Sequence, residues 1–214
     1  VRGGGGPLNE DQGRKDLAMI SRLAYDRRLT FGAGGNLSLR LDGSTALITP
    51  SGAIKGLLTP EQMIRVDIGT GRAETGRPSM ETPFHMGIYR ARPDVGAVVH
   101  LHPTACTVLA VMRRALRPAI TPEGVLVLGD LVPLIGYAGP GTTELANNIV
   151  RQLGKANACL LESHGALVVG RDIVDAFGRM ETLEYIASLQ LRCEALGDLE
   201  ELPPQEVARM LSKQ

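Results

Sequence analysis

The chain has 214 residues, with 23 Lys plus Arg, 23 Asp plus Glu and only 3% aromatic residues. The basic residues are scattered and form no stripe with aromatic residues, which argues against nucleic acid as a partner, because binding to a phosphate backbone needs clustered positive charge. The length suits one large domain, and no repeat, linker or change of composition divides it.

Cysteine usage points to a reducing compartment. The three cysteines form no Cys-x-x-Cys pair and are too few for a disulfide framework, so we expect buried small apolar residues in a cytoplasmic protein. They are Cys106, Cys159 and Cys193.

The N-terminal segment and the longest apolar stretch both argue against a membrane partner. Residues 1–8 lack the apolar core of a signal peptide and are expected to be a flexible tail before one domain over residues 9–214. The longest apolar stretch, residues 125–135, is broken by Gly129 and Pro133, so we predict no transmembrane segment.

The N-terminal third predicts one helix and then hairpin-rich strands. Asn9 and Gln12 resemble a capping box, and apolar residues at helical spacing predict a helix to about Leu29. The glycine-rich residues 31–36 follow this helix and precede a strand, the reverse of the order in a dinucleotide-binding fingerprint, which is thereby excluded. The pattern predicts strands over 36–40, 45–49 and 64–68, a hairpin turn at 42–43 and a helix start at Thr59.

The rest of the chain alternates helices with short strands. A helix opening in the segment 76–81 should stop near Pro93, and a buried strand over 94–102 follows it. The further predicted elements are a helix over 103–111, strands over 125–128 and 132–135, a helix over 141–154, strands over 158–162 and 166–169, a helix over 173–196 and a tail helix after 203–204.

Histidines end the buried strand over 94–102. Because successive side chains of a strand point to opposite faces, His100 and His102 should share one face. A third, His164, lies at a corner between two predicted strands. Three imidazoles suit an open zinc site, and Mn, Co, Ni or Fe are alternatives. The fourth histidine, His85, is expected to be a core or rim residue outside the site.

Glu81 is the candidate carboxylate beside such a metal. A glutamate in the first turn of a helix commonly compensates the helix dipole, and an acid/base role is the alternative. The spacing of the residues alone does not bring Glu81 to the histidines.

Five segments resemble the class II aldolase/adducin family in order and spacing, over residues from about 15 to 195. They are Gly34–Ser38, Thr49–Gly52, Pro78–Glu81, Tyr89–His102 and Ser163–Gly165. L-fuculose-1-phosphate aldolase and L-ribulose-5-phosphate 4-epimerase are the best-known enzymes of that family.

The resemblance implies an α/β fold, a three-layer α/β/α single domain around a mostly antiparallel sheet, assembled as a homotetramer with active sites between subunits. It implies a divalent metal, zinc first and Mn, Co or Fe otherwise. By motif position, the metal ligands would be His100, His102 and His164, the catalytic acid/base Glu81, and the substrate-binding residues Asn36, Ser51, Gly52 and Ser79.

The activity implied is that of a metal-dependent aldolase of carbohydrate metabolism, a lyase that cleaves a carbon–carbon bond of a small ketose phosphate or related oxo acid through a metal-stabilised enediolate. Met80 stands where the aldolase has a second serine, Ala33 where a threonine is usual, and the aldolase's tyrosines lack clear equivalents. An epimerase, decarboxylase or dehydratase acting on a sugar phosphate or an aromatic or oxo acid therefore stays open. A non-enzymatic adducin-like scaffold is the last alternative, and the intact histidines and Glu81 speak against it.

Overall fold

The computed structural model describes residues 9–212. In chain order its elements are α1 (Glu10–Asp26), β1 (Asn36–Arg40), β2 (Thr45–Ile48), η1 (Lys55–Leu57), η2 (Pro60–Gln62), β3 (Ile64–Asp67), α2 (Thr82–Ala91), β4 (Ala97–Leu101), α3 (Thr104–Val111), η3 (Pro118–Ile120), α4 (Pro122–Leu128), β5 (Leu134–Ile135), α5 (Thr143–Leu153), β6 (Ala158–Leu161), β7 (Gly165–Gly170), α6 (Ile173–Leu196) and α7 (Pro204–Leu211), where η denotes a 3₁₀-helix.

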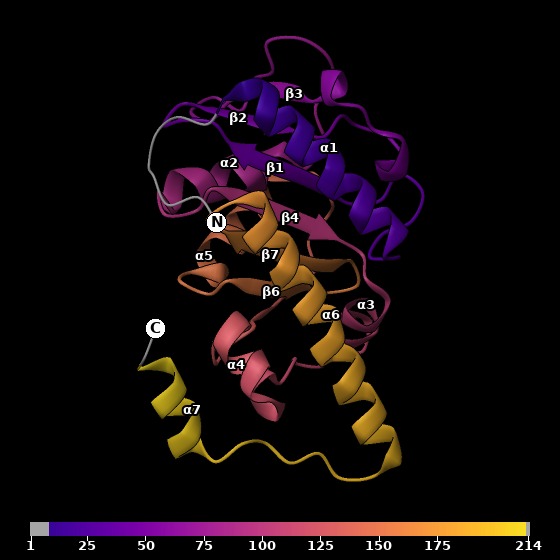
Figure 1. Cartoon of the computed structure of the whole chain (residues 1–214), viewed down its shortest axis with the longest axis vertical. Coiled ribbons are helices and arrows are strands. Elements are labelled where there is room, and N and C mark those ends of the chain that lie inside the picture. Colours follow the sequence, from indigo (N-terminus) through magenta and orange to yellow (C-terminus); the bar gives the residue numbers. More distant parts are fainter. Residues whose placement is uncertain (1–8, 213–214) are drawn as a thin grey trace.

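One seven-stranded sheet crosses the middle of the molecule in the order β3-β2-β1-β4-β7-β6-β5 (Figure 1). All neighbouring strands are antiparallel except β5 and β6. The register places His100 of β4 opposite Asn36 of β1 on one side and Leu167 of β7 on the other. The prediction of a mostly antiparallel sheet is confirmed.

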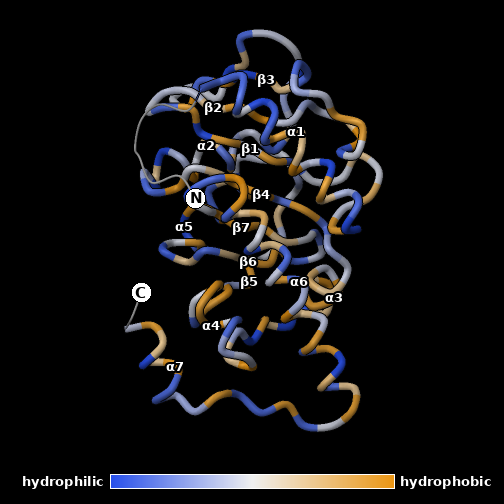
Figure 2. The backbone as a smooth tube through the Cα atoms, in the orientation of Figure 1, coloured by the Kyte–Doolittle hydropathy of each residue, from blue (hydrophilic) through white to orange (hydrophobic). Residues whose placement is uncertain are grey.

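Helices cover both faces of this sheet. Val99 and Leu101 of β4 belong to the core shared with α1, α3 and α6, while Val98 belongs to the core shared with α2 and α5. Figure 1 shows α1 and α6 across the near face, and Figure 2 shows apolar residues along the central strands β4, β6 and β7. The alternation along one strand thus builds two cores, and the three-layer α/β/α domain is confirmed.

The predicted strand over 125–128 is wrong, because these residues form the end of α4. Thr121 caps this helix by accepting from the Gly124 N–H at 3.0 Å, and Gly129, with φ of 87°, closes it. Val125 and Leu128, one helical turn apart, are buried. A four-residue apolar run does not distinguish a strand from a buried helix. Here the cap residues on both sides of the run are what indicate a helix.

Several predicted boundaries shift at the ends of elements. α1 ends at Asp26 rather than near Leu29, and β5 is shorter than the strand expected over 132–135. The capping box at Thr59 is present, although the helix that it starts is a single 3₁₀ turn. The expected tail of residues 1–8 lies outside the described residues.

All three cysteines are free, as expected, and two of them are buried. Cys106 and Cys159 lie in the two cores, whereas Cys193 is partly exposed on α6. Among the helices of residues 9–212, none combines the length and apolar character needed to cross a membrane.

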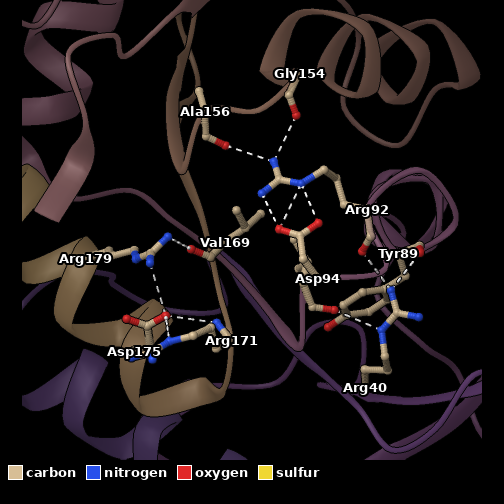
Figure 3. A network of polar contacts seen from close by, with 11 residues as sticks. Arg40, Tyr89, Arg92, Asp94, Gly154, Ala156, Val169, Arg171, Asp175 and Arg179 are labelled. Atoms are coloured by element: carbon tan, nitrogen blue, oxygen red, sulfur yellow. Dashed lines mark hydrogen bonds and ion pairs between the residues drawn. The ribbon is translucent and has the colours of Figure 1, made fainter. Parts of the chain in front are cut away.

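Arginine contacts fix the helix ends at the edge of the sheet where β4 begins (Figure 3). The Arg92 guanidinium pairs with Asp94 at 2.7 Å and donates to the Gly154 carbonyl at 2.9 Å, which joins the ends of α2 and α5. Arg40 of β1 donates to the Tyr89 carbonyl at 2.6 Å. The last carbonyls of a helix have no partner within it, so these contacts satisfy them and hold α2 against the sheet.

Candidate metal centre

Three histidines meet where β4 ends and β7 begins. His100 is fully buried in β4, His102 directly follows that strand, and His164 lies in the turn between β6 and β7 beside Ser163, whose φ is 55°. One ring nitrogen of each lies within 4.8 Å of the others. His100 Nε2 and His102 Nε2 are 3.2 Å apart. The prediction that the His-x-His pair meets the third histidine is thus realised in the geometry.

The surroundings of His100 and His102 favour neutral rings. The Nδ1–H of His100 donates to the Ala166 carbonyl at 2.9 Å, so its Nε2 lone pair faces the cluster. Burial, followed by His164 and His102, lowers the pKa of His100 well below its usual value. Burial, followed by His164, lowers the pKa of His102 to about 4. Neutral imidazole is the form that binds a metal.

Glu81 approaches the same cluster from the N-terminal end of α2. It is 5% exposed, and its Oε2 accepts from the Asn36 side-chain amide at 2.7 Å and lies 3.3 Å from His100 Nε2. Its Oε1 lies 3.5 Å from His164 Nε2 and, although it is buried, has no hydrogen-bond partner among residues 9–212. A buried carboxylate oxygen without a partner is unfavourable unless a cation or a proton satisfies it, so these residues fit a divalent metal ion.

Ser79 shapes the start of α2 and thereby places Glu81. Its Oγ accepts from the Glu81 N–H at 3.2 Å, and its carbonyl accepts from the Thr82 hydroxyl at 2.6 Å. Pro83 follows in the first turn, where the absence of a backbone N–H costs nothing. The chain therefore turns sharply enough to direct Glu81 towards β1 and β4.

The glycine turn before β1 packs directly on the histidines. A Cβ atom at Gly34 would lie 2.9 Å from His102 Nδ1, and one at Gly35, whose φ is 70°, would lie 2.6 Å from the His100 carbonyl. Any larger residue would displace these groups. The turn does more than reverse the chain, because it closes one side of the histidine cluster.

A pocket of about 240 Å³ opens above the histidines. Of the eight residues predicted for the site, seven line it: Asn36, Ser51, Gly52, Ser79, Glu81, His102 and His164. The eighth, His100, lies fully buried beside Glu81. Ala33 and Met80, the two positions that depart from the aldolase pattern, also line it.

Lys55 is a pocket residue that the sequence analysis missed. Its side chain is 1% exposed, and its ammonium donates to the carbonyls of Ala53 at 2.7 Å and Ala33 at 3.0 Å. No ion pair within residues 9–212 involves it, and burial lowers its pKa to about 8. Its signal in the sequence was a lysine three residues after the Ser51–Gly52 turn.

His85 is buried, as expected, yet it touches a predicted site residue. Its Nε2 lies 2.5 Å from Asn36 Oδ1, and its Nδ1 lies 2.7 Å from Ser38 Oγ. The sequence signal was the four-residue spacing from Glu81 to His85 to Tyr89, which puts all three on one face of α2.

Comparison with known proteins identifies relatives that match the chain over most of their length. The chain is 35% identical over 174 residues to L-fuculose phosphate aldolase of Methanococcus maripaludis, covering 81% of this chain and 93% of that protein. It is 35% identical over 185 residues to 3-oxo-tetronate 4-phosphate decarboxylase of Haemophilus influenzae, covering 84% and 87%. A solved structure of L-fuculose 1-phosphate aldolase matches with a TM-score of 0.89 at 32% identity, covering 98% of this chain and 99% of that one.

The family comparison covers most of the chain. Residues 15–191 match the family model described as class II aldolase and adducin N-terminal domain. Together with the relatives and the histidine cluster, this match establishes that the chain belongs to the class II aldolase and adducin family.

Proposed function

We propose that the chain is a divalent-metal-dependent lyase that cleaves a carbon–carbon bond of a small ketose phosphate or related oxo acid. The observation that carries this proposal is the buried, unpartnered Glu81 Oε1 beside the three histidines. An adducin-like scaffold has no chemical need for such a group, because an unpartnered buried carboxylate oxygen lowers stability.

His100, His102 and His164 would hold the ion, with zinc as the first choice and Mn, Co or Fe as alternatives. When bound, the ion would supply Lewis-acid stabilisation of the negative charge that develops on the substrate oxygens. Glu81 would move the proton at the carbon that becomes the enediolate or enolate carbon. Asn36, through its amide contact with Glu81 Oε2, holds that carboxylate in place and leaves Oε1 available.

The other end of the pocket suits an anionic group. Ser51, Gly52, Ser79 and Lys55 line it, and the Lys55 ammonium donates to two carbonyls and has no carboxylate partner within residues 9–212. A phosphate or carboxylate would neutralise that buried charge. We therefore assign the phosphate or carboxylate end of the substrate to this side of the pocket.

Decarboxylation of an oxo acid phosphate is the second candidate reaction. The similarity to a 3-oxo-tetronate 4-phosphate decarboxylase supports it, as do Ala33 and Met80 in the pocket wall. Loss of CO₂ and retro-aldol cleavage both leave an enolate that needs the same charge stabilisation and the same proton, so one arrangement of residues serves both.

For assembly we propose a cytoplasmic homotetramer with active sites between subunits. Large apolar side chains near the pocket and on the neighbouring loops are exposed in the single chain, which supports coverage by a second copy. They include Phe31, Met80 and Tyr137.

The decisive experiment combines metal analysis with a substrate panel. Purified protein titrated with Zn²⁺, Co²⁺ or Mn²⁺ should bind one ion per chain, and a His102→Ala variant should lose it. Ketose phosphates and oxo acid phosphates are then assayed separately for aldehyde release and for CO₂ release. Absence of metal binding would refute the lyase, and release of CO₂ without release of an aldehyde would select the decarboxylase.

A further inference from the structure

Two polar stripes face each other between α2 and β1. Four residues of helix advance about 6.0 Å and two residues of strand about 6.8 Å, so side chains at these spacings stay in step across the interface. The stripe on α2, starting at its cap, is Glu81, His85 and Tyr89, and the stripe on β1 is Asn36, Ser38 and Arg40.

Hydrogen bonds link these stripes into one continuous chain. The Tyr89 hydroxyl lies 2.8 Å from Ser38 Oγ, and Ser38 Oγ lies 2.7 Å from His85 Nδ1. His85 Nε2 lies 2.5 Å from Asn36 Oδ1, and the Asn36 amide donates to Glu81 Oε2 at 2.7 Å. Every member is buried, so water does not compete for these contacts.

The direction of every bond follows from the carboxylate end. The Asn36 NH₂ donates to Glu81 Oε2, so the Asn36 oxygen is the atom that faces His85 Nε2. His85 therefore carries its proton on Nε2 and accepts at Nδ1, which makes Ser38 the donor there. The Tyr89 hydroxyl then donates to Ser38. All four bonds donate in the same direction, towards Glu81.

The far end of the chain is held in place from outside. The Arg40 guanidinium stacks 4.7 Å from the centre of the Tyr89 ring and donates to the Tyr89 carbonyl, as Figure 3 shows. Burial, followed by His100, lowers the pKa of His85 to about 3, so this ring stays neutral at physiological pH. Hydrogen bonds aligned in a buried chain polarise and strengthen one another.

We propose that Tyr89, Ser38 and His85 form a one-directional hydrogen-bond relay that positions Glu81 through Asn36. The three are positioning residues, since none of them lines the pocket. The relay keeps the Asn36 amide from flipping, and a flipped amide would turn its oxygen against the carboxylate. The effect of the relay on catalysis rests on the proposed acid/base role of Glu81. The direction in which its hydrogen bonds donate does not depend on that role.

The first experiment determines the direction of the hydrogen bonds in the relay and needs no substrate. In protein labelled with ¹⁵N-histidine, the two ring nitrogens differ in shift according to which one carries the proton, and the His85 signals are identified by their loss in His85→Gln. We expect a neutral Nε2–H ring near pH 7. Ser38→Ala should keep the Nε2–H ring but shift the Nδ1 signal, because Nδ1 loses the hydroxyl that donates to it, whereas Ser21→Ala should leave both signals unchanged. Ser21 is a matched control, because its hydroxyl is buried on α1 and has no hydrogen-bond partner within residues 9–212. A native Nδ1–H ring would overturn the relay.

The second experiment reads the consequence for turnover. Ser38→Ala should lower kcat by roughly tenfold with KM nearly unchanged, and Tyr89→Phe, one bond further from Glu81, should lower it by roughly two- to threefold. Ser38→Thr, which keeps the hydroxyl, should recover most of the rate, and Ser21→Ala should match the wild type. Thermal unfolding of each variant checks that it is folded.

The outcomes separate the inference from the proposed function. If Glu81→Gln abolishes turnover while folded Ser38→Ala keeps the full kcat, the relay is wrong and the lyase assignment stands. If Glu81→Gln leaves turnover unchanged, the acid/base role of Glu81 is wrong, whatever tautomer His85 adopts.

Discussion

Glu81 Oε1 is buried 3.5 Å from His164 Nε2 and has no hydrogen-bond partner in the described part of the chain, while the other oxygen of the same carboxylate is held by Asn36. The two oxygens of Glu81 are therefore unequal. One is fixed by a neutral amide, and the other is open to a proton or to a cation shared with the histidines. This difference between the two oxygens suits an acid/base carboxylate, because one oxygen fixes its position while the other exchanges the proton.

Glu81→Gln should separate metal binding from proton transfer. The three histidines remain, so we expect one Co²⁺ per chain, while turnover falls by about 10²- to 10⁴-fold, the usual contribution of a positioned acid/base. Metal content and kcat measured on the same preparation test this. Glu123→Gln is the matched control, since Glu123, like Glu81, lies at the N-terminal end of a helix but is exposed. Undiminished turnover in Glu81→Gln would remove Glu81 from this role.

Gly165→Ala should damage the metal centre from the backbone side. A Cβ atom at Gly165 would lie 2.6 Å from the Leu101 carbonyl and 2.7 Å from His102 Cδ2, so β4 and β7 must separate or the imidazole must move. We expect Co²⁺ affinity to fall at least tenfold in a folded protein, measured by the visible absorption of the bound ion. Gly178→Ala, on α6, should bind the ion normally, because its added Cβ would meet no other described part of the chain within 4 Å. Equal affinities in both variants would contradict this account.

The sequence predicts those parts of the site whose geometry is set within a single strand or turn. The His-x-His spacing fixes a shared face within a single strand, and the corner at His164 lies between two recognisable strands. Glu81 was harder, because its approach to His100 depends on how α2 lies across β1 and β4. That approach came to the sequence analysis only through the family resemblance.

The contacts of His85 and Lys55 at the site could not be predicted from the sequence, for a physical reason. Each looks ordinary along the chain, and each gains its meaning from partners far away in sequence, Asn36 for His85 and the Ala33 carbonyl for Lys55. Pairings between distant segments are invisible to periodicity within one segment. The strand wrongly predicted over 125–128 has a different explanation. The information was local, because the cap residues beside the apolar run mark it as the end of a helix.

Lys55→Met should weaken binding of a phosphate-ended substrate more than it slows the chemistry. The ammonium lies in the pocket with two of its three protons given to backbone carbonyls, so one remains for an anion. We expect KM to rise by roughly tenfold, as for loss of one hydrogen bond to a charged group, with kcat reduced much less. Steady-state kinetics on a ketose phosphate test this, and Lys15→Met at an exposed position of α1 is the control. Unchanged KM in Lys55→Met would place the anion elsewhere.

Lys55 also predicts how stability changes with pH. Burial lowers its pKa in the folded chain from 10.5 to about 8, so between these values the unfolded chain binds more protons and folding stability must rise with pH. Below pH 8 both states are protonated and the wild type carries the full cost of a buried charge, which amounts to roughly 3 kcal/mol for a shift of this size.

Urea unfolding at a series of pH values isolates this contribution. The free energy of unfolding of the wild type, minus that of Lys55→Met, should stay level below pH 8 and rise as the pH approaches 10.5, because only the wild type regains stability as the buried ammonium loses its proton. The same difference taken with Lys15→Met should stay nearly flat. A flat difference for Lys55→Met as well would mean that Lys55 keeps its ordinary pKa, and its ammonium would then have to reach solvent or a carboxylate in the folded chain.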